Sequence, residues 1–274
     1  MLDLISLATS KSLSRFLLEA RTAGLDVSSL ATAQESVADR LLNALREHPI
    51  GRKATESANW QVLITPSESG TSPDIPYSDL LEVARQSSVE VQGWMFPFIG
   101  QNPAPENHQD FIQGSIEFRQ HREVWRLYQS GLFAHLGALS LDSHRYWIPG
   151  NPPATEDGTP KLGFRYVIVL ITEALRFASR LTTQLATVSS IAVTIRFTGL
   201  SGTELGNDNA DSLPFMSPYR TDMDEYKWSQ IISRSTINAE ADALALDIAS
   251  DFLARYRFNR SSDDLRDFQA KLMR

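Results

Sequence analysis

The segment from Ile116 to Leu141 constrains the fold of this chain more than any other. It contains two runs rich in Val, Trp, Leu, Tyr and Phe, at residues 123–129 and 132–139, which are joined by Ser130 and Gly131. A two-residue Ser-Gly connection between runs of this composition is typical of a β-hairpin. We therefore expect a hairpin in this segment.

The side chains of the first run divide into two sets, because successive side chains of a strand point to opposite faces of its sheet. The sets are Val124, Arg126 and Tyr128 on one face, and Trp125, Leu127 and Gln129 on the other. Both faces carry large apolar groups. The hairpin is therefore expected at the centre of a sheet that is covered on at least one face.

The rest of the chain predicts further strands and long helices. Strands are predicted at residues 60–65, 89–99, 191–198 and 226–235. The strongest helix prediction is 163–186, where apolar residues occupy most of the circumference, as in a helix buried against a sheet. A last helix is expected to begin with Asn238 as its cap. This order predicts an α+β fold: a mainly antiparallel sheet with a central hairpin, packed by two long helices, plus a helical N-terminal extension.

Two units are predicted: a helical N-terminal segment, 1–55, and an α+β domain, 56–274. The second helix of the first unit opens with capping-box spacing from Thr32 to Glu35, and it is expected to stop at Pro49. We favour a helical segment that packs on the chain's own sheet. The alternative is a partner-binding or dimerisation element.

Composition removes several classes of function. The 274 residues include no cysteine, which excludes disulfides, thiolate zinc sites, iron–sulfur clusters and cysteine nucleophiles. The formal charge of −7 argues against a chain that coats nucleic acid by charge alone. No run approaches the roughly 20 apolar residues of a membrane span, and the start does not resemble a signal peptide. The expected location is the cytoplasm.

Common catalytic motifs are missing from the sequence. It contains neither of the glycine-rich nucleotide-binding patterns, G-x-x-x-x-G-K-[ST] and G-x-G-x-x-G, and neither G-x-S-x-G nor H-E-x-x-H. The five histidines, of which His121 and His135 flank the hairpin, show no spacing that requires a metal site, so structural or surface roles are expected. We therefore predict no resident metal and no cofactor, and we favour a protein that is not an enzyme.

One acidic pattern supports an enzymatic alternative. Glu225 and Lys227 share one face at the start of a predicted strand, and Asp211 precedes them in a loop. A carboxylate followed by Glu-x-Lys on a strand is the arrangement by which many metal-dependent nucleases hold Mg²⁺ and activate water. The competing interpretation is a solvated acidic loop beside a strand.

Guanidinium and aromatic groups are mixed around the hairpin, as on surfaces that bind single-stranded nucleic acid. The candidate binding residues are Trp94, Arg119, Arg122, Trp125, Arg126 and Tyr128. Arginine side chains that lie over an apolar sheet face are the more common explanation of such a pattern.

Several ordered segments together resemble a known family. They are Trp60–Pro66, Ile75–Leu80, Val91–Pro97, Trp125–Phe133, Thr194–Gly202 and Pro218–Arg220. This set resembles the C-terminal region of bacterial proteins that carry a Schlafen-type, AlbA-like DNA- or ATP-binding domain, over about residues 60–257. The family's N-terminal domain is replaced here by mostly helical sequence, so the resemblance does not transfer ATP or DNA binding to particular residues. It implies a sensor or interaction module in a nucleic-acid-handling or antiviral defence system.

Our leading hypothesis is a non-enzymatic sensing or interaction module. The expected partner is a protein, with nucleic acid or a second copy of the chain as alternatives, and the contact is expected at the helical N-terminus or near Trp94, Trp125 and Tyr128. The nuclease of Asp211, Glu225 and Lys227 is the second hypothesis. A third is a small-molecule pocket between the 163–186 helix and the sheet.

Overall fold

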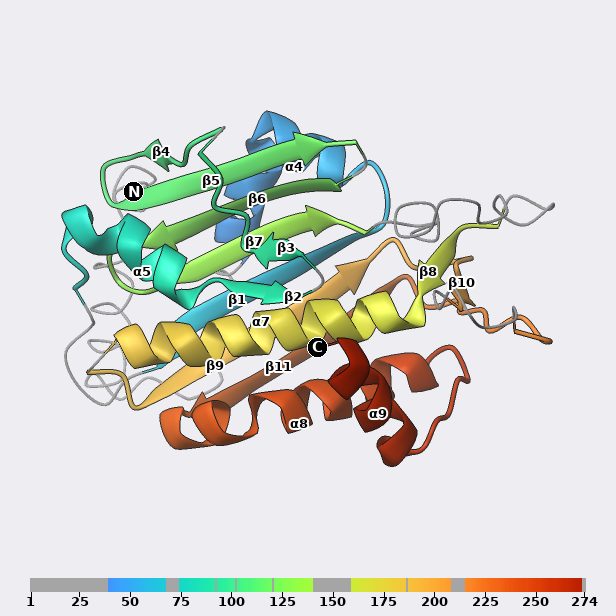
Figure 1. The fold of residues 1–274 in the computed structure, drawn as a ribbon. Helices are drawn as coiled ribbons and strands as arrows, with labels where there is room; N and C mark the ends of the chain where they lie inside the picture. The colour runs from blue at the N-terminus through green and yellow to red at the C-terminus, as the bar shows by residue number, and fades with distance from the viewer. Residues whose placement is uncertain are drawn as a thin grey trace, which may run out of the picture.

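A large antiparallel sheet organises the computed structural model, which describes residues 39–67, 74–91, 93–101, 103–119, 121–139, 159–185, 187–207 and 215–272. Within these residues the sheet has seven strands (Figure 1). In spatial order they are β11 (Glu225–Ser233), β9 (Ser190–Thr198), β1 (Asn59–Ser67), β7 (Phe133–Ala138), β6 (His121–Tyr128), β5 (Phe111–Phe118) and β4 (Glu106–Asn107). With its helices, the sheet makes an α+β fold, as predicted.

The predicted hairpin is formed by β6 and β7 and lies in the middle of the sheet. The backbone N–H of Gly131 donates to the carbonyl of Tyr128, and the N–H of Tyr128 donates to the carbonyl of Leu132, each at 2.9 Å. Gly131 has a φ of 72°, and a Cβ there would lie 2.7 Å from a methyl group of Leu185. The positive φ therefore favours glycine at this turn, and a larger residue would also displace the side chain of Leu185.

The two faces of the sheet are covered by different helices. Trp125 and Leu127 belong to one buried cluster, beneath α5 (Leu80–Ser87), α7 (Phe164–Gln184) and α8 (Arg234–Ala254). Val124 and Tyr128 belong to a second cluster, under residues 39–47 and α4 (Pro49–Ala54). The predicted alternation along β6 is thus confirmed, and both faces are covered.

Helix α7 is buried because it packs against the sheet on one side and against the neighbouring helix α8 within the same layer (Figure 1). Its apolar residues surround most of the helix, and the buried set extends from Phe164 to Thr182. A helix in contact with neighbours on two sides needs this distribution. The prediction of a buried helix at 163–186 is confirmed.

Two local predictions need correction. Residues 89–99 form a short hairpin, β2 (Val89–Val91) and β3 (Trp94–Phe96), because Gly93 at φ 77° reverses the chain. The last long helix begins at Arg234 rather than after Asn238, because the hydroxyl of Ser233 accepts from the N–H of Thr236 at 3.0 Å and caps the helix there.

Other elements were not predicted from the sequence. They are β5, the helix α9 (Ser262–Leu272), and a parallel pair of short strands, β8 (Lys161–Gly163) with β10 (Glu204–Gly206). The second helix of the N-terminal segment stops before Pro49, as predicted, and the separate short helix α4, which was not predicted, begins at that proline.

The described part of the N-terminal segment packs on the chain's own sheet, which was the favoured prediction. Leu42, Leu45 and Ala54 lie in the second cluster with β6 and β7 residues. The boundary at residues 55 and 56 stays a prediction. No described helix is both long enough and apolar enough to cross a membrane.

Candidate functional site

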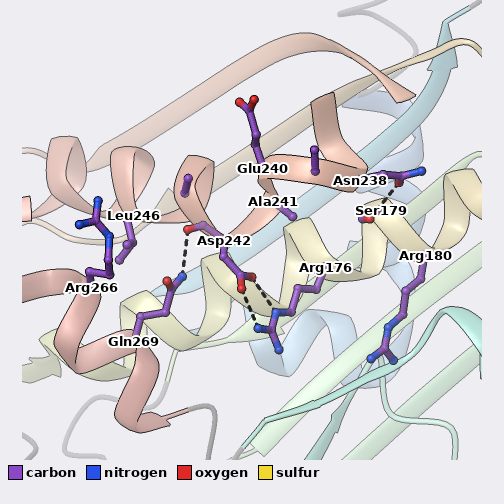
Figure 2. Close-up of a pocket in the computed structure, with 12 residues that line it drawn as sticks. Arg176, Ser179, Arg180, Asn238, Glu240, Ala241, Asp242, Leu246, Arg266 and Gln269 are labelled. Carbon is purple, nitrogen blue, oxygen red and sulfur yellow. Dashed lines mark hydrogen bonds and ion pairs between the residues drawn. The ribbon is translucent and has the colours of Figure 1, made fainter. Parts of the chain in front are cut away.

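A concave site lies on the outer side of the helical layer, where α7, α8 and α9 meet (Figure 2). We call it the helical groove; its volume is about 610 Å³. It is lined by Arg176, Ser179 and Arg180 of α7, by residues 238–243 and Leu246 of α8, and by Arg266 and Gln269 of α9. The groove therefore lies on the side of α7 away from the sheet, and not between α7 and the sheet, where the third hypothesis placed a pocket.

An ion pair joins the two long helices in the floor of this groove. Nε and one terminal nitrogen of Arg176 each donate to a carboxylate oxygen of Asp242 at 2.7 Å. This hydrogen bonding raises the pKa of Arg176. A two-pronged guanidinium–carboxylate pair fixes geometry as well as charge, so α7 and α8 are held in one relative position here.

Helix α9 is attached to the same place by one buried amide. The side-chain nitrogen of Gln269 donates to the hydroxyl of Thr172 and to the backbone carbonyl of Asp242, each at 3.0 Å. On the other side, the hydroxyl of Ser179 donates to the side-chain oxygen Oδ1 of Asn238 at 2.9 Å. The groove is thus a built surface whose walls are tied by hydrogen bonds.

Cationic side chains lie at both ends of the groove. Figure 2 shows Arg266 at one end and Arg180 at the other, with Arg176 between them. Arg180 donates to the backbone carbonyl of Ser88, and Arg266 pairs with Asp263 at 2.9 Å. Three arginines against Glu240 and Asp242 leave the lining with one net positive charge. This mixed surface suits a polar partner that presents both signs of charge.

A second polar group is buried between the sheet and α7. Glu123 of β6 is buried, and its carboxylate accepts from the backbone N–H of Phe98 at 2.6 Å and from Nε2 of His121 at 3.0 Å. Nε2 of His135 lies 3.6 Å from the same carboxylate. Because an ionised carboxylate only accepts hydrogen bonds, His121 must carry its proton on Nε2.

The surroundings shift the pKa values of two carboxyl groups, Glu123 and the neighbouring Glu173, in opposite directions. Burial alone would raise the pKa of Glu123, but the hydrogen bond from His121 and the imidazole of His135 outweigh it and lower the pKa to about 2. On α7, burial raises the pKa of Glu173 well above its usual value, and the negative charge of Glu123 raises it further. Glu123 is therefore ionised, while Glu173 favours its neutral form.

Aromatic rings surround this cluster. The ring of His135 is fully buried, 4.7 Å from the ring of Trp60 and 4.9 Å from that of Phe96. Trp94 lies 4.4 Å from the ring of His121. Within the described part of the chain, no three His, Cys, Asp or Glu side chains are placed to hold a metal ion. The arrangement ties β6, β7, α7 and the β2–β3 segment together.

The six predicted binding residues do not form one cleft. Trp125 is buried on the helical face and donates to the carbonyl of Phe98 at 2.9 Å. Tyr128 is buried on the opposite face, in the second cluster. Arg126 donates to the side-chain oxygen of Gln113 at 2.8 Å. The alternation of β6 that places Trp125 in the core of the helical face directs Arg126 and Tyr128 to the other face of the sheet.

The remaining three lie near the turn between β5 and β6. Trp94 and the guanidinium of Arg119 both lie beside the ring of Phe118, which is about half exposed. Arg122 pairs with Glu117 at 3.0 Å. Whether these groups bind anything stays a prediction.

The nuclease pattern is only partly within the described structure. Glu225 and Lys227 lie on one exposed face of β11, as predicted, whereas Asp211 falls outside the described residues. The carboxylate of Glu225 accepts from Arg196 at 2.7 Å. This carboxylate is therefore paired with an arginine, and the nuclease pattern stays a prediction.

The residues of the helical groove were not found from the sequence. Their signal was present in α7, where Arg176, Ser179 and Arg180 interrupt an otherwise apolar helix at a spacing of three and four residues. Glu173 was a similar signal, as an acidic residue on a helix predicted to be buried. The partners of these side chains come from α8, α9 and the hairpin, which local spacing does not identify.

Comparisons of the chain with protein-family models, with curated proteins and with solved structures found no match.

Proposed function

We propose that the chain is a non-enzymatic interaction module that binds a partner protein in the helical groove. The observation that carries this proposal is the groove itself, a cavity of about 610 Å³ whose walls are fixed by the Arg176–Asp242 pair and by Gln269. A rigid polar concavity of this size accepts side chains of a docked segment without rearrangement of the helices.

Charge favours a protein over nucleic acid as the partner. A surface that follows a phosphate backbone presents a dense row of cations, whereas this lining has a net charge of +1 on a chain of −7. Arg180 and Arg266 at the two ends suit an elongated segment with acidic side chains near both ends. Glu240 adds a place for a basic side chain.

The biological setting is part of the proposal. The resemblance of residues 60–257 to the C-terminal region of Schlafen-type, AlbA-like bacterial proteins supports a cytoplasmic module of a nucleic-acid-handling or antiviral defence system. Nothing in this setting depends on a cofactor.

Native mass spectrometry of the chain, gently purified from its own host, tests the proposal. We expect a second protein to accompany it, and its binding to the pure chain is then measured by calorimetry. The variants Arg180→Glu and Arg266→Glu should each weaken that binding about 10-fold or more, as expected when a cation at an interface is reversed.

The matched control is Arg52→Glu, which reverses an exposed arginine of α4 on the opposite face of the sheet. It should leave the binding unchanged. A partner whose affinity is insensitive to both groove variants would contradict the groove assignment. A chain that purifies alone would contradict the interaction module.

A further inference from the structure

The short hairpin of β2 (Val89–Val91) and β3 (Trp94–Phe96) lies against two buried carboxyl groups. Of the strands that the structure describes, β2 pairs with β3 alone, and the pair packs beside α7 rather than joining the main sheet (Figure 1). The carboxyl groups belong to Glu123 of β6 and Glu173 of α7, which are 2% and 6% exposed. We call this pair of strands the inner hairpin.

Polar contacts hold the base of the inner hairpin. Arg180 of α7 donates to the backbone carbonyl of Ser88, directly before β2. Two residues after β3, the N–H of Phe98 donates to the carboxylate of Glu123 at 2.6 Å, and its carbonyl accepts from Nε1 of Trp125 at 2.9 Å. The base is therefore tied to α7 on one side and to β6 on the other.

The tip of the inner hairpin is held less well. At this end the backbone of Val91 faces the carboxyl of Glu173, and the ring of Trp94 lies 4.4 Å from that of His121. The indole N–H of Trp94 is buried without a hydrogen-bond partner among the described groups, and so are both ring nitrogens of His135. Buried polar atoms without partners cost free energy that contact with water would recover. Opening of the tip therefore costs less than opening of the base.

The charges around Glu173 make this tip sensitive to pH. The titratable groups that face its carboxyl are His121 and Glu123 from β6 and His135 from β7. Burial and the negative charge of Glu123 raise the pKa of Glu173, so it keeps its proton in the closed state. A rise in pH ionises Glu173 and also removes protons from imidazoles, so it supplies no cation to balance two adjacent carboxylates. The other charged side chains of β2, α5 and the next turns of α7 are exposed or line the helical groove: Glu82, Arg85, Glu90, Arg176 and Arg180.

We propose that the inner hairpin is a pH-sensitive element, whose tip is closed on α7 while Glu173 carries its proton and opens when Glu173 loses it. The hairpin moves because its neighbours cannot: α7 is buried around most of its circumference, and β6 is a central strand of the main sheet. Opening lets water reach both carboxylates, which removes the cost of two buried charges. The proposal does not depend on what binds in the helical groove.

Thiol labelling of the full chain tests this proposal. The natural sequence has no cysteine, so a single one reports on its own surroundings. Val91→Cys places a thiol at the tip, where the natural side chain is 4% exposed. Its rate of reaction with dithiodipyridine is measured from pH 5 to pH 9 and divided by the rate for the same chain unfolded in urea, which corrects for the fraction of thiolate.

The sign follows from the raised pKa of Glu173. Closure is complete below the unfolded value of 4.5 and is lost as the pH rises toward the folded value. The corrected rate should therefore rise with pH, by up to about 10-fold per pH unit, since opening releases one proton. In a chain that also carries Glu173→Gln, the corrected rate should be the same at every pH.

A control separates opening of the tip from unfolding of the chain. Ile195→Cys places the thiol in β9, where the natural side chain is fully buried in the main sheet, and it should react far more slowly throughout. Equal rates at the two positions would overturn the proposal, as would a corrected rate for Val91→Cys that is constant with pH or that still rises with Glu173→Gln.

Hydrogen exchange gives the same test without a new thiol, should Val91→Cys disturb the fold. Mass spectrometry follows the backbone amides of residues 87–99 in the unmodified chain and in Glu173→Gln. Protection, corrected for the intrinsic pH dependence of exchange, should fall as the pH rises in the unmodified chain alone. The same pH dependence in both chains would overturn the proposal.

Discussion

Replacement of Glu123 by glutamine removes one buried negative charge and almost no volume. The carboxylate accepts hydrogen bonds from Phe98 and His121 and faces His135 at 3.6 Å. An amide can accept one of these bonds, but its NH₂ group cannot replace a charged acceptor toward the imidazoles. Glu123→Gln should therefore destabilise the fold through the β2–β3 segment and β7 together.

Two estimates of the cost agree. Removal of one partner from a buried ionic group typically costs about 3–5 kcal/mol. Independently, a pKa of Glu123 that falls from 4.5 to about 2 corresponds to about 3 kcal/mol of stabilisation of the ionised form. We expect Glu123→Gln to lower the free energy of unfolding by about 3 kcal/mol at pH 7, measured by urea denaturation.

The pH dependence has a defined sign. Because the folded pKa of Glu123 is lowered, its contribution is complete above the unfolded value of 4.5 and is lost as the pH falls toward 2. The difference between the natural chain and Glu123→Gln should therefore shrink over this range. Urea denaturation at pH 7, 5, 4 and 3 follows it.

Glu117→Gln is the matched control, since Glu117 pairs with Lys53 and Arg122 on the exposed side of the neighbouring strand. The free energy of unfolding of this variant should differ little from that of the natural chain at any of these pH values. A loss below about 1 kcal/mol for Glu123→Gln at pH 7 would refute the reasoning, because a buried ionised carboxylate cannot be so weakly held.

Three further predictions test other parts of the fold. Burial raises the pKa of Glu173, so the natural chain loses stability as the pH rises and this carboxyl is ionised. The gain in the free energy of unfolding from Glu173→Gln should therefore be larger at pH 9 than at pH 5, measured by urea denaturation. An equal effect at both pH values would contradict this. Gly131→Ala should cost about 1–3 kcal/mol, since φ is 72° and Leu185 is too close; an unchanged thermal midpoint would show that the turn relaxes. Ser233→Ala should cost about 1 kcal/mol by removal of the α8 cap, whereas Ser235→Ala, two residues into the helix, should cost less in the same thermal assay.

Local signals in the sequence determined the central hairpin, the two faces of β6 and the buried helix α7. Each depends on residues within a few positions of one another: the Ser130–Gly131 turn, the alternation from Val124 to Tyr128, and the apolar circumference of residues 163–186. Turn chemistry and the periods of strand and helix act over such distances, so they can be read from one stretch of chain.

The same kind of reasoning failed where two local signals compete. Residues 89–99 have strand composition throughout, but Gly93 permits a positive φ and divides them into β2 and β3. The start of α8 was misplaced because Ser233 and Asn238 are both good caps, and only the path of the chain out of β11 selects the first.

Only the tertiary structure decided which elements meet. The order of the sheet places β1 between β7 and β9, and in the helical groove Arg176 of α7 pairs with Asp242 of α8, 66 positions away in sequence. The cluster of Glu123 likewise brings together His135 of β7, Glu173 of α7 and Phe98 of the loop after β3. The hydrophobic effect is non-directional: it favours burial of apolar area against any apolar surface. Periodicity therefore indicates which face of each element is buried, but it does not identify the element that covers this face. The partners are chosen by the packing of the whole chain, and the helical groove is a product of that packing.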